Sequence, residues 1–191
     1  TFHYNGTTNL GSNGSLVNGT NTAVLLDTAS NVTSSGSSVV GASLNGQYTG
    51  ITPSGFTAGI EGENRGTIAL GDSSAGLYGI NGARLLNKGN ITVGNTSLGM
   101  SGKGTGSSLR NDGNMIIGES SQGMYGSESS DMTNAGSITS LSSNATGMYA
   151  DNASAMTINN TGTIDLQENN TNGIYTKGTG TKTIINSGII K

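Results

Sequence analysis

The segment "LLNKGNITV", residues 85–93, alternates between two kinds of residue. Leu85, Asn87, Gly89, Ile91 and Val93 stand at every second position, and the residues between them are mostly polar. Successive side chains of a strand point to opposite faces, so this period of two predicts extended β-structure with one buried face. A period of 3.6 residues is lacking, and the glycine density disfavours a helix.

The same pattern returns along the chain at steps of 23, 24, 23, 26 and 26 residues. Its first mark is Asn-x-Gly, which begins at Asn64, Asn87, Asn111, Asn134, Asn160 and Asn186. A second mark follows 12 or 13 residues later and reads Gly76-Leu77-Tyr78, Gly99-Met100-Ser101, Gly123-Met124-Tyr125, Gly147-Met148-Tyr149 and Gly173-Ile174-Tyr175. Two marks in register over five units define an internal repeat.

One such unit is too small to bury its apolar side alone, but stacked units would bury it between them. The apolar positions then form three inward columns. They are Ile68, Ile91, Met115, Ile138, Ile164 and Ile189; Leu77, Met100, Met124, Met148 and Ile174; and Leu85, Leu109, Met132, Ile158 and Ile184. We therefore predict an all-β fold, a parallel β-helix (β-solenoid) with three faces and about 23–26 residues per coil. Parallel crossovers are almost always right-handed, so we expect that hand.

The repeat divides the chain into two parts. Residues 64–191 carry the regular repeats, and the last unit breaks off soon after Asn186. Residues 1–63 are expected to form degenerate coils of the same solenoid, with a loop around Pro53 and with Phe2 and Tyr4 over a coil end. A separate cap is the alternative. The start at Thr1 and the unfinished last unit suggest a piece of a longer protein that continues beyond Lys191.

Composition narrows the classes of function. The 191 residues include 33 Gly, one Pro and no Cys, only 10% are charged, and the net charge is −3. Eight scattered basic residues give no nucleic-acid footprint. The apolar runs are too short for membrane insertion. Disulfides and cysteine-based metal sites are excluded.

The repeated asparagines are predicted to play a structural role. By strand parity Asn64, Asn87, Asn111, Asn134, Asn160 and Asn186 point inward at a corner, each near a glycine that permits a tight turn. A buried amide is costly unless it is paired, and stacked amides can pair along a column. We expect Asn111→Leu to be more damaging than a surface change such as Ser107→Ala.

An outward column of aromatic residues is the candidate for partner binding. Tyr78, Tyr125, Tyr149 and Tyr175 occupy it, and Ser101 interrupts it. Stacked tyrosines can simply cover a sheet and support neighbouring strands. Alternatively they form a contact strip for a partner protein or sugar, because tyrosine is favoured at interfaces.

The ionisable residues predict no catalytic site, metal site or cofactor. His3 is the only histidine. One outward column reads Asp72, Asn95, Glu119, Ser142 and Glu168, so its carboxylates skip coils and stand about 10 Å apart. Lys88 and Asp112 fall at the same position of adjacent coils and are expected to form an exposed ion pair, which contributes about 0–1 kcal/mol.

The full repeat, N-x-G-x-I … G-[M/I/L]-Y … L/I-x-N-x-G over about residues 64–191, resembles the passenger repeats of large fusobacterial-type autotransporter adhesins (type V secretion). Ser101 departs from that pattern, and residues 1–63 share only composition. The resemblance implies a non-catalytic segment at the bacterial cell surface that attaches to a protein or glycan of host cells or other bacteria. It also implies that a C-terminal outer-membrane barrel, not present here, anchors the longer chain.

Three other functions are weighed against an adhesin segment. A purely structural stalk would leave binding to other parts of the protein. A carbohydrate-active β-helix enzyme would need three or more carboxylates clustered in a groove. An ice-binding solenoid would need a regular threonine array, but the third position after each repeat asparagine reads Thr67, Asn90, Asn114, Ser137, Thr163 and Ile189.

Overall fold

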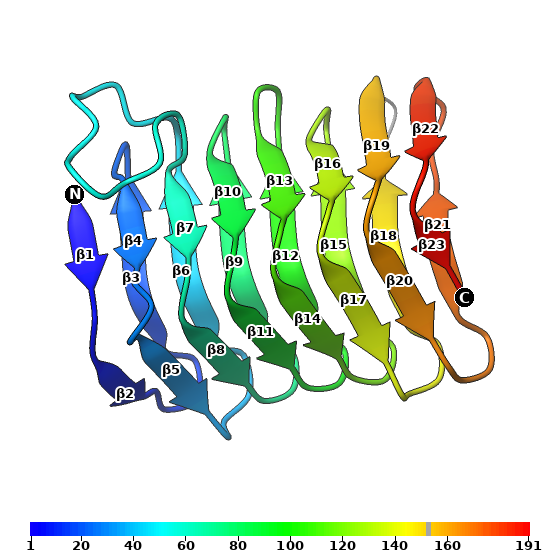
Figure 1. Ribbon diagram of the computed structural model, residues 1–191, viewed down its shortest axis with the longest axis horizontal. Coiled ribbons are helices and arrows are strands. Elements are labelled where there is room, and N and C mark those ends of the chain that lie inside the picture. The colour runs from blue at the N-terminus through cyan, green and yellow to red at the C-terminus, as the bar shows by residue number, and fades with distance from the viewer. Residues whose placement is uncertain (152–153) are drawn as a thin grey trace.

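The chain folds as a parallel β-solenoid of about eight coils, with about 24 residues per coil and three faces. The structure, a computed structural model, describes residues 1–151 and 154–191. Successive coils stack side by side, and each sheet runs along the whole stack (Figure 1). This arrangement confirms the fold class predicted from the repeat.

The strands of the described residues belong to three parallel sheets. The first sheet holds β1 (Phe2–Tyr4), β4 (Val24–Leu26), β7 (Gly62–Asn64), β10 (Arg84–Asn87), β13 (Ser108–Asn111), β16 (Asp131–Asn134), β19 (Met156–Asn160) and β22 (Lys182–Asn186). The second holds β2 (Thr7–Asn9), β5 (Asn31–Ser34), β8 (Thr67–Leu70), β11 (Asn90–Val93), β14 (Asn114–Ile117), β17 (Ser137–Ser140), β20 (Thr163–Leu166) and β23 (Ile189–Ile190). The third holds β3 (Ser15–Thr20), β6 (Val40–Asn45), β9 (Ala75–Ile80), β12 (Leu98–Lys103), β15 (Gln122–Ser127), β18 (Thr146–Asp151) and β21 (Asn172–Thr176).

The three predicted columns form much of the core, which also contains apolar residues outside them, such as Val93 and Ile117. Ile184 is in register with Ile158, as predicted, but is 50% exposed in the last coil. One column assignment needs correction. Strand register pairs Ile91 with Met115 in the second sheet and Met100 with Met124 in the third. In the last coil, however, Ile164 pairs with Ile190, whereas Ile189 pairs with Thr163. Assigning Ile189 to the core column was therefore wrong. Ile190 follows its repeat asparagine by four residues, as the other column members do, and the alternation of the strand turns its neighbour to the opposite face.

The repeat glycines are required for a different reason from the one expected. None of the glycines in the Asn-x-Gly motifs has a positive φ. A Cβ on Gly113 would instead lie 2.7 Å from the carbonyl carbon of Lys88 and closer still to the carbonyl oxygen of Gly89. The same clash recurs at Gly89, Gly136 and Gly162. Glycine is needed here because adjacent coils approach too closely for any side chain.

Residues 1–63 lie in the same three sheets as the regular repeats. Tyr4 pairs with Leu26, and Leu26 pairs with Asn64, so the N-terminal coils are in register with the rest. Phe2 and Tyr4 are partly buried against the core, and their rings stack with centroids 6.1 Å apart.

The longest connection, residues 46–61, joins β6 to β7 and bends back over the first sheet (Figure 1). Hydrogen bonds tie it down: the backbone N–H of Thr57 donates to Glu63 Oε2 (3.2 Å), and Arg65 donates to the carbonyl of Gly55 (2.7 Å). Leu25, Glu63 and Leu86 form an outward row under this loop and are nevertheless buried.

Candidate functional site

The six repeat asparagines form one hydrogen-bonded column at a corner of the solenoid. The Nδ2 of each donates to the Oδ1 of the asparagine in the next coil, at 2.8 Å in all five steps from Asn64 to Asn186. Five of the six are completely buried, and Asn186 is exposed. The column satisfies amides that would otherwise be costly inside the core.

The column begins at Asn64, and its first rung is incomplete. The preceding coil has Leu26 at the paired position, so no amide donates to Asn64 Oδ1. That oxygen is buried and has no hydrogen-bond partner. The asparagine column therefore starts in the coil of Asn64, because the coil before it has leucine at the paired position.

Serine residues build two further buried corners that the sequence analysis missed. Ser74, Ser97 and Ser121 occupy one corner, where the backbone N–H of each of the first two donates to the Oγ of the next at 3.0 Å. Ser107 lies at another, accepts from the N–H of Gly82 (2.9 Å) and is only 2% exposed. Treating Ser107 as a surface residue was wrong. For the corner of Ser74, Ser97 and Ser121, the sequence did contain a signal: a serine stands ten residues after each of three repeat asparagines.

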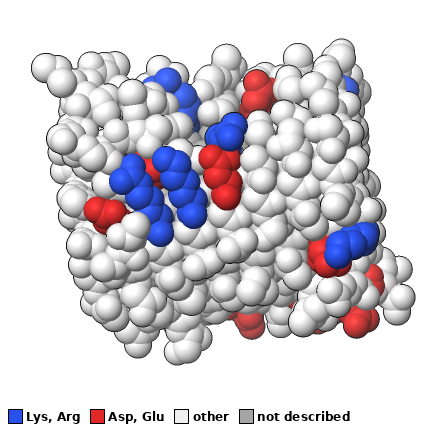
Figure 2. Space-filling view, in the orientation of Figure 1, with Lys and Arg blue, Asp and Glu red and all other residues white. Residues whose placement is uncertain are grey.

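Two buried carboxylates, again unforeseen from the sequence, stand where the long loop ends: Glu61 is its last residue, and Glu63 lies just after it in β7. Glu61 is 1% exposed and pairs with Arg84 (2.7 Å), and Glu63 is 2% exposed and pairs with Arg65 (2.7 Å) and Lys88 (2.9 Å). Several charged side chains lie together over this part of the first sheet, a smaller group lies at the lower right of the view, and most of the face is uncharged (Figure 2).

The expected ion pair between Lys88 and Asp112 does not form. Lys88 binds Glu63, and Asp112 pairs with Arg110 at 2.8 Å. The buried carboxylate competes better for the lysine because Glu63 has little water to solvate it.

The pKa of Glu63 reflects two opposing causes. Burial raises it, but hydrogen bonds from Arg65, Lys88 and Thr57 favour the ionised form and hold the pKa below its ordinary value of 4.5. An acid with a lowered pKa stabilises the fold above its unfolded pKa, and this contribution is lost as the pH falls through the folded value.

We therefore expect Glu63→Gln to destabilise the protein at neutral pH, by about 1–2 kcal/mol after solvent screening of its partly exposed partners. The difference from the native protein should shrink below about pH 4.5, where the unfolded carboxyl is protonated. Urea unfolding at about pH 7 and pH 3 measures both values. Glu119→Gln, at an exposed carboxylate, is the control and should change stability by less than about 0.5 kcal/mol at either pH. If the free energies of unfolding of Glu63→Gln and the native protein differ by the same amount at about pH 7 and pH 3, the prediction is contradicted.

The predicted tyrosines lie on the outer face of the third sheet. Tyr125, Tyr149 and Tyr175 form a continuous stack, with ring centroids 5.4 and 5.0 Å apart and interplanar angles of 21° and 29°. Strand register places Ser101 between Tyr78 and Tyr125. We call these five positions the tyrosine row. The structure thus brings three of the four predicted tyrosines together and separates Tyr78 from them by one coil.

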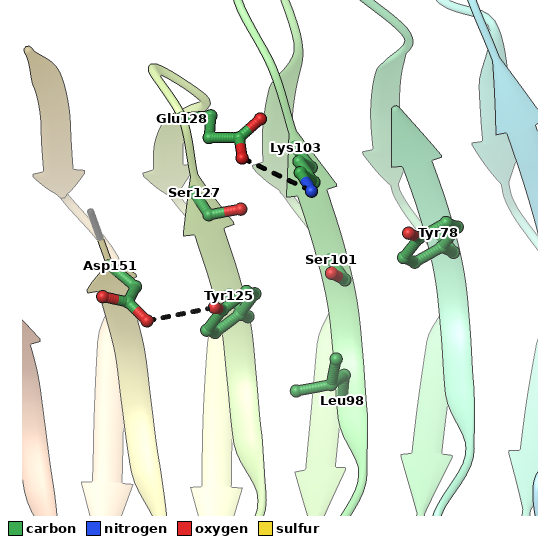
Figure 3. A pocket seen from close by; sticks show the side chains of 8 residues that line it. All are labelled: Tyr78, Leu98, Ser101, Lys103, Tyr125, Ser127, Glu128 and Asp151. Atoms are coloured by element: carbon green, nitrogen blue, oxygen red, sulfur yellow. Dashed lines mark hydrogen bonds and ion pairs between the residues drawn. The ribbon is translucent and has the colours of Figure 1, made fainter. Parts of the chain in front are cut away.

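A hollow of about 440 Å³ opens in the tyrosine row where Ser101 replaces a ring. Tyr78 and Tyr125 are its two walls, and Ser101, which is only 3% exposed, lies at its floor (Figure 3). The other lining residues are Leu98, Lys103, Ser127, Glu128 and Asp151. We refer to this hollow as the Ser101 slot. The sequence showed the missing tyrosine but not the polar groups that register places around it.

The polar groups of the slot are held by interactions with one another (Figure 3). The hydroxyl of Tyr125 donates to Asp151 Oδ2 at 3.3 Å, and Lys103 Nζ lies 3.3 Å from Glu128 Oε1. Burial, together with the Asp151 carboxylate, raises the pKa of Tyr125 above its ordinary value of 10.0. Tyr125 therefore carries its proton. The side chains of Lys103 and Glu128 are each about half exposed.

The outward column that begins at Asp72 supports turns. Asp72 Oδ1 accepts from the N–H of Asn95 (2.7 Å), and Asn95 Oδ1 accepts from the N–H of Glu119 (2.9 Å). Among the described residues, no group of three or more His, Asp or Glu side chains is placed to hold a metal ion. Nor does any described segment form a helix that is long and apolar enough to span a membrane. Comparisons of the chain with protein-family models, curated proteins and solved structures found no match.

Proposed function

We propose that this chain is a non-catalytic segment of a surface-exposed adhesin passenger, and that the third sheet is its partner-binding face. The partner is a protein or glycan on host cells or on other bacteria. The segment is held at the cell surface through an outer-membrane anchor in another part of the protein.

The observation that carries this proposal is the tyrosine row, with its stacked rings and its open slot. Tyrosines offer a large rigid contact area at low entropic cost and are enriched at the energetic centres of interfaces. Several carboxylates have structural partners instead: Glu61 and Glu63 pair with basic side chains, and Asp72 supports a turn. This use of carboxylates supports a binding role over hydrolysis.

A purely structural stalk is the second candidate, and the asparagine column favours it. A buried chain of amides that links six coils stiffens the rod whether or not any face binds a partner. The two functions differ in one measurable respect, because a stalk has no face whose side chains matter for attachment.

We expect the double variant Tyr125→Ser/Tyr149→Ser to weaken attachment of the purified protein to its target cells by at least about tenfold, as loss of two interface tyrosines does. Ser101 already occupies the same row, so serine is compatible with the sheet there. Attachment is measured against a panel of host and bacterial cells and a glycan panel.

The matched control is Ile116→Ser, which removes an exposed apolar side chain from β14 in the second sheet and should leave attachment unchanged. Melting curves verify that both variants are folded. Undiminished attachment by the folded double variant would remove the tyrosine row as the site. If the native segment binds no cell or glycan in the panel, the stalk is the better description.

A further inference from the structure

We infer that the Ser101 slot binds a single neutral pyranose ring of a glycan, held between Tyr78 and Tyr125. This inference deepens the proposed function and rests on it, because it assigns a ligand class to the face proposed to bind. Its evidence is the width of the slot, the aromatic character of its walls and the polar groups at its rim.

The strand spacing leaves room for about one six-membered ring between the walls of the slot. Its walls belong to β9 and β15, which are separated by β12 and therefore by two strand spacings, roughly 9.6 Å. The same row shows what fits in such a space: the ring of Tyr149 fills the gap between Tyr125 and Tyr175, at 5.4 and 5.0 Å from their centroids. Ser101 is almost fully buried and has no ring, so this gap lacks the ring that fills the other.

The walls favour a ligand with two exposed faces. A ring that enters edge-on from solvent would present one face to Tyr78 and the other to Tyr125. Aromatic rings bind such faces by dispersion and burial of apolar surface. Pyranose rings offer C–H groups on their faces and direct their hydroxyls outward from their edges, which suits this geometry.

The polar side chains around the opening of the slot favour a ligand whose edge carries hydroxyls over one with an apolar edge. Ser127, Glu128 and Asp151 lie on one side of the slot, and Lys103 lies at the end of the floor strand (Figure 3). These side chains supply both donors and acceptors, and Lys103 and Glu128 are exposed enough to turn toward a ligand. A purely aromatic partner would leave most of them unused.

The formal charge of the rim selects among sugars. Lys103 contributes one positive charge and Glu128 and Asp151 contribute two negative charges, so the rim carries a net charge of −1. An anionic sugar would be repelled, because a like charge in a partly desolvated site raises the free energy of binding. The slot therefore selects a neutral ring over a uronic or sialic acid.

The decisive variant is Ser101→Tyr, which restores the ring that most repeats have and closes the slot. The other tyrosines show that the sheet accepts this side chain, so the fold should be retained. The matched control is Ser43→Tyr. Ser43 lies outside the tyrosine row but pairs with Tyr78 on the side away from the slot, so the added ring leaves the slot open.

Binding is measured by NMR titration of the purified protein with methyl glycosides of neutral hexoses and N-acetylhexosamines, with glucuronic and sialic acid, and with a tyrosine-containing peptide. We expect millimolar binding of at least one neutral glycoside, much weaker binding of the acids, loss of at least about tenfold in Ser101→Tyr, and no loss in Ser43→Tyr. If Ser101→Tyr does not fold, Tyr78→Ser, which removes one wall, must show the same loss.

Saccharide binding that persists in folded Ser101→Tyr would overturn the inference, as would the absence of any neutral-sugar binding to the native protein. Binding of the peptide in place of the sugars would overturn the ligand class and point to a protein partner. Cell attachment is assayed separately. If attachment survives closure of the slot, the glycan assignment is contradicted and the proposed function stands. If the native protein binds sugar but attaches to no cell, the proposed function is contradicted and the glycan assignment stands.

Discussion

Replacing Asn111 by leucine is expected to destabilise the protein by about 3 kcal/mol, although the two side chains are similar in size. Asn111 accepts from Asn87 and donates to Asn134, both at 2.8 Å. The substitution breaks both bonds and leaves a buried N–H of Asn87 and the buried Oδ1 of Asn134 without these partners. Each buried polar group left unsatisfied costs about 1–3 kcal/mol, which the added apolar burial offsets only in part.

The matched control is Asn64→Leu at the first rung. Asn64 Oδ1 already lacks a partner, so this change removes one unsatisfied oxygen and creates another at Asn87. The number of unsatisfied acceptors stays the same, and we expect a cost of only about 1 kcal/mol. Free energies of unfolding from urea titrations of the two variants decide the matter. Equal costs, or a larger cost at Asn64, would contradict the role assigned to the column.

The second large effect is expected from one added methyl group. In Gly113→Ala the new Cβ would collide with the backbone of the preceding coil, at Lys88 and Gly89. Backbone atoms cannot rotate away as a side chain can, so the two coils must separate locally and weaken their hydrogen bonds. We expect a loss of about 3 kcal/mol, the upper end of what overpacking usually costs, measured as a lowered urea midpoint.

Gly11→Ala is the control for Gly113→Ala. Gly11 has no positive φ, and a Cβ there would meet no atom within 4 Å. Its substitution should change stability by less than about 0.5 kcal/mol. If both alanine variants unfold at the same urea concentration, the close approach of the coils is not what requires glycine in the motif.

The repeat alone predicts most of this fold. The period of two in segments such as 85–93 and the 23–26-residue return place the strands, the three faces and the core columns. They succeed because a solenoid repeats the same local environment in every coil, so each unit reports on all the others. Even the error at Ile189 is one of counting along an otherwise correct strand.

Contacts made by the irregular part of the chain could not be predicted in the same way. Strand parity alone turns Leu25, Glu63 and Leu86 toward solvent, and they are buried because the loop of residues 46–61 bends over them. Nothing in the repeat encodes where that loop lies. The ion pair of Lys88 with Glu63 depends on the same loop, which is why the simpler pairing with Asp112 was wrong.

For the candidate site, the sequence predicts the tyrosine row and its interruption at Ser101, but not the polar residues that surround the slot. Ser101 is visible as an interruption among tyrosines, since it falls at a fixed place in the repeat. Glu128 and Asp151 lie beyond the second mark of their units, and only the register of β12, β15 and β18 brings them to the same hollow.

The asparagine column also has a mechanical consequence. Its bonds run from coil to coil, along the axis of the rod, so a pull on the two ends loads them in series. Each coil contributes only about 4.8 Å to the length of the rod, yet holds about 24 residues, or roughly 80 Å of extended chain. A rod under tension would then lengthen in large steps, as one coil after another unfolded from the end. The coils that remained folded would keep their three sheets.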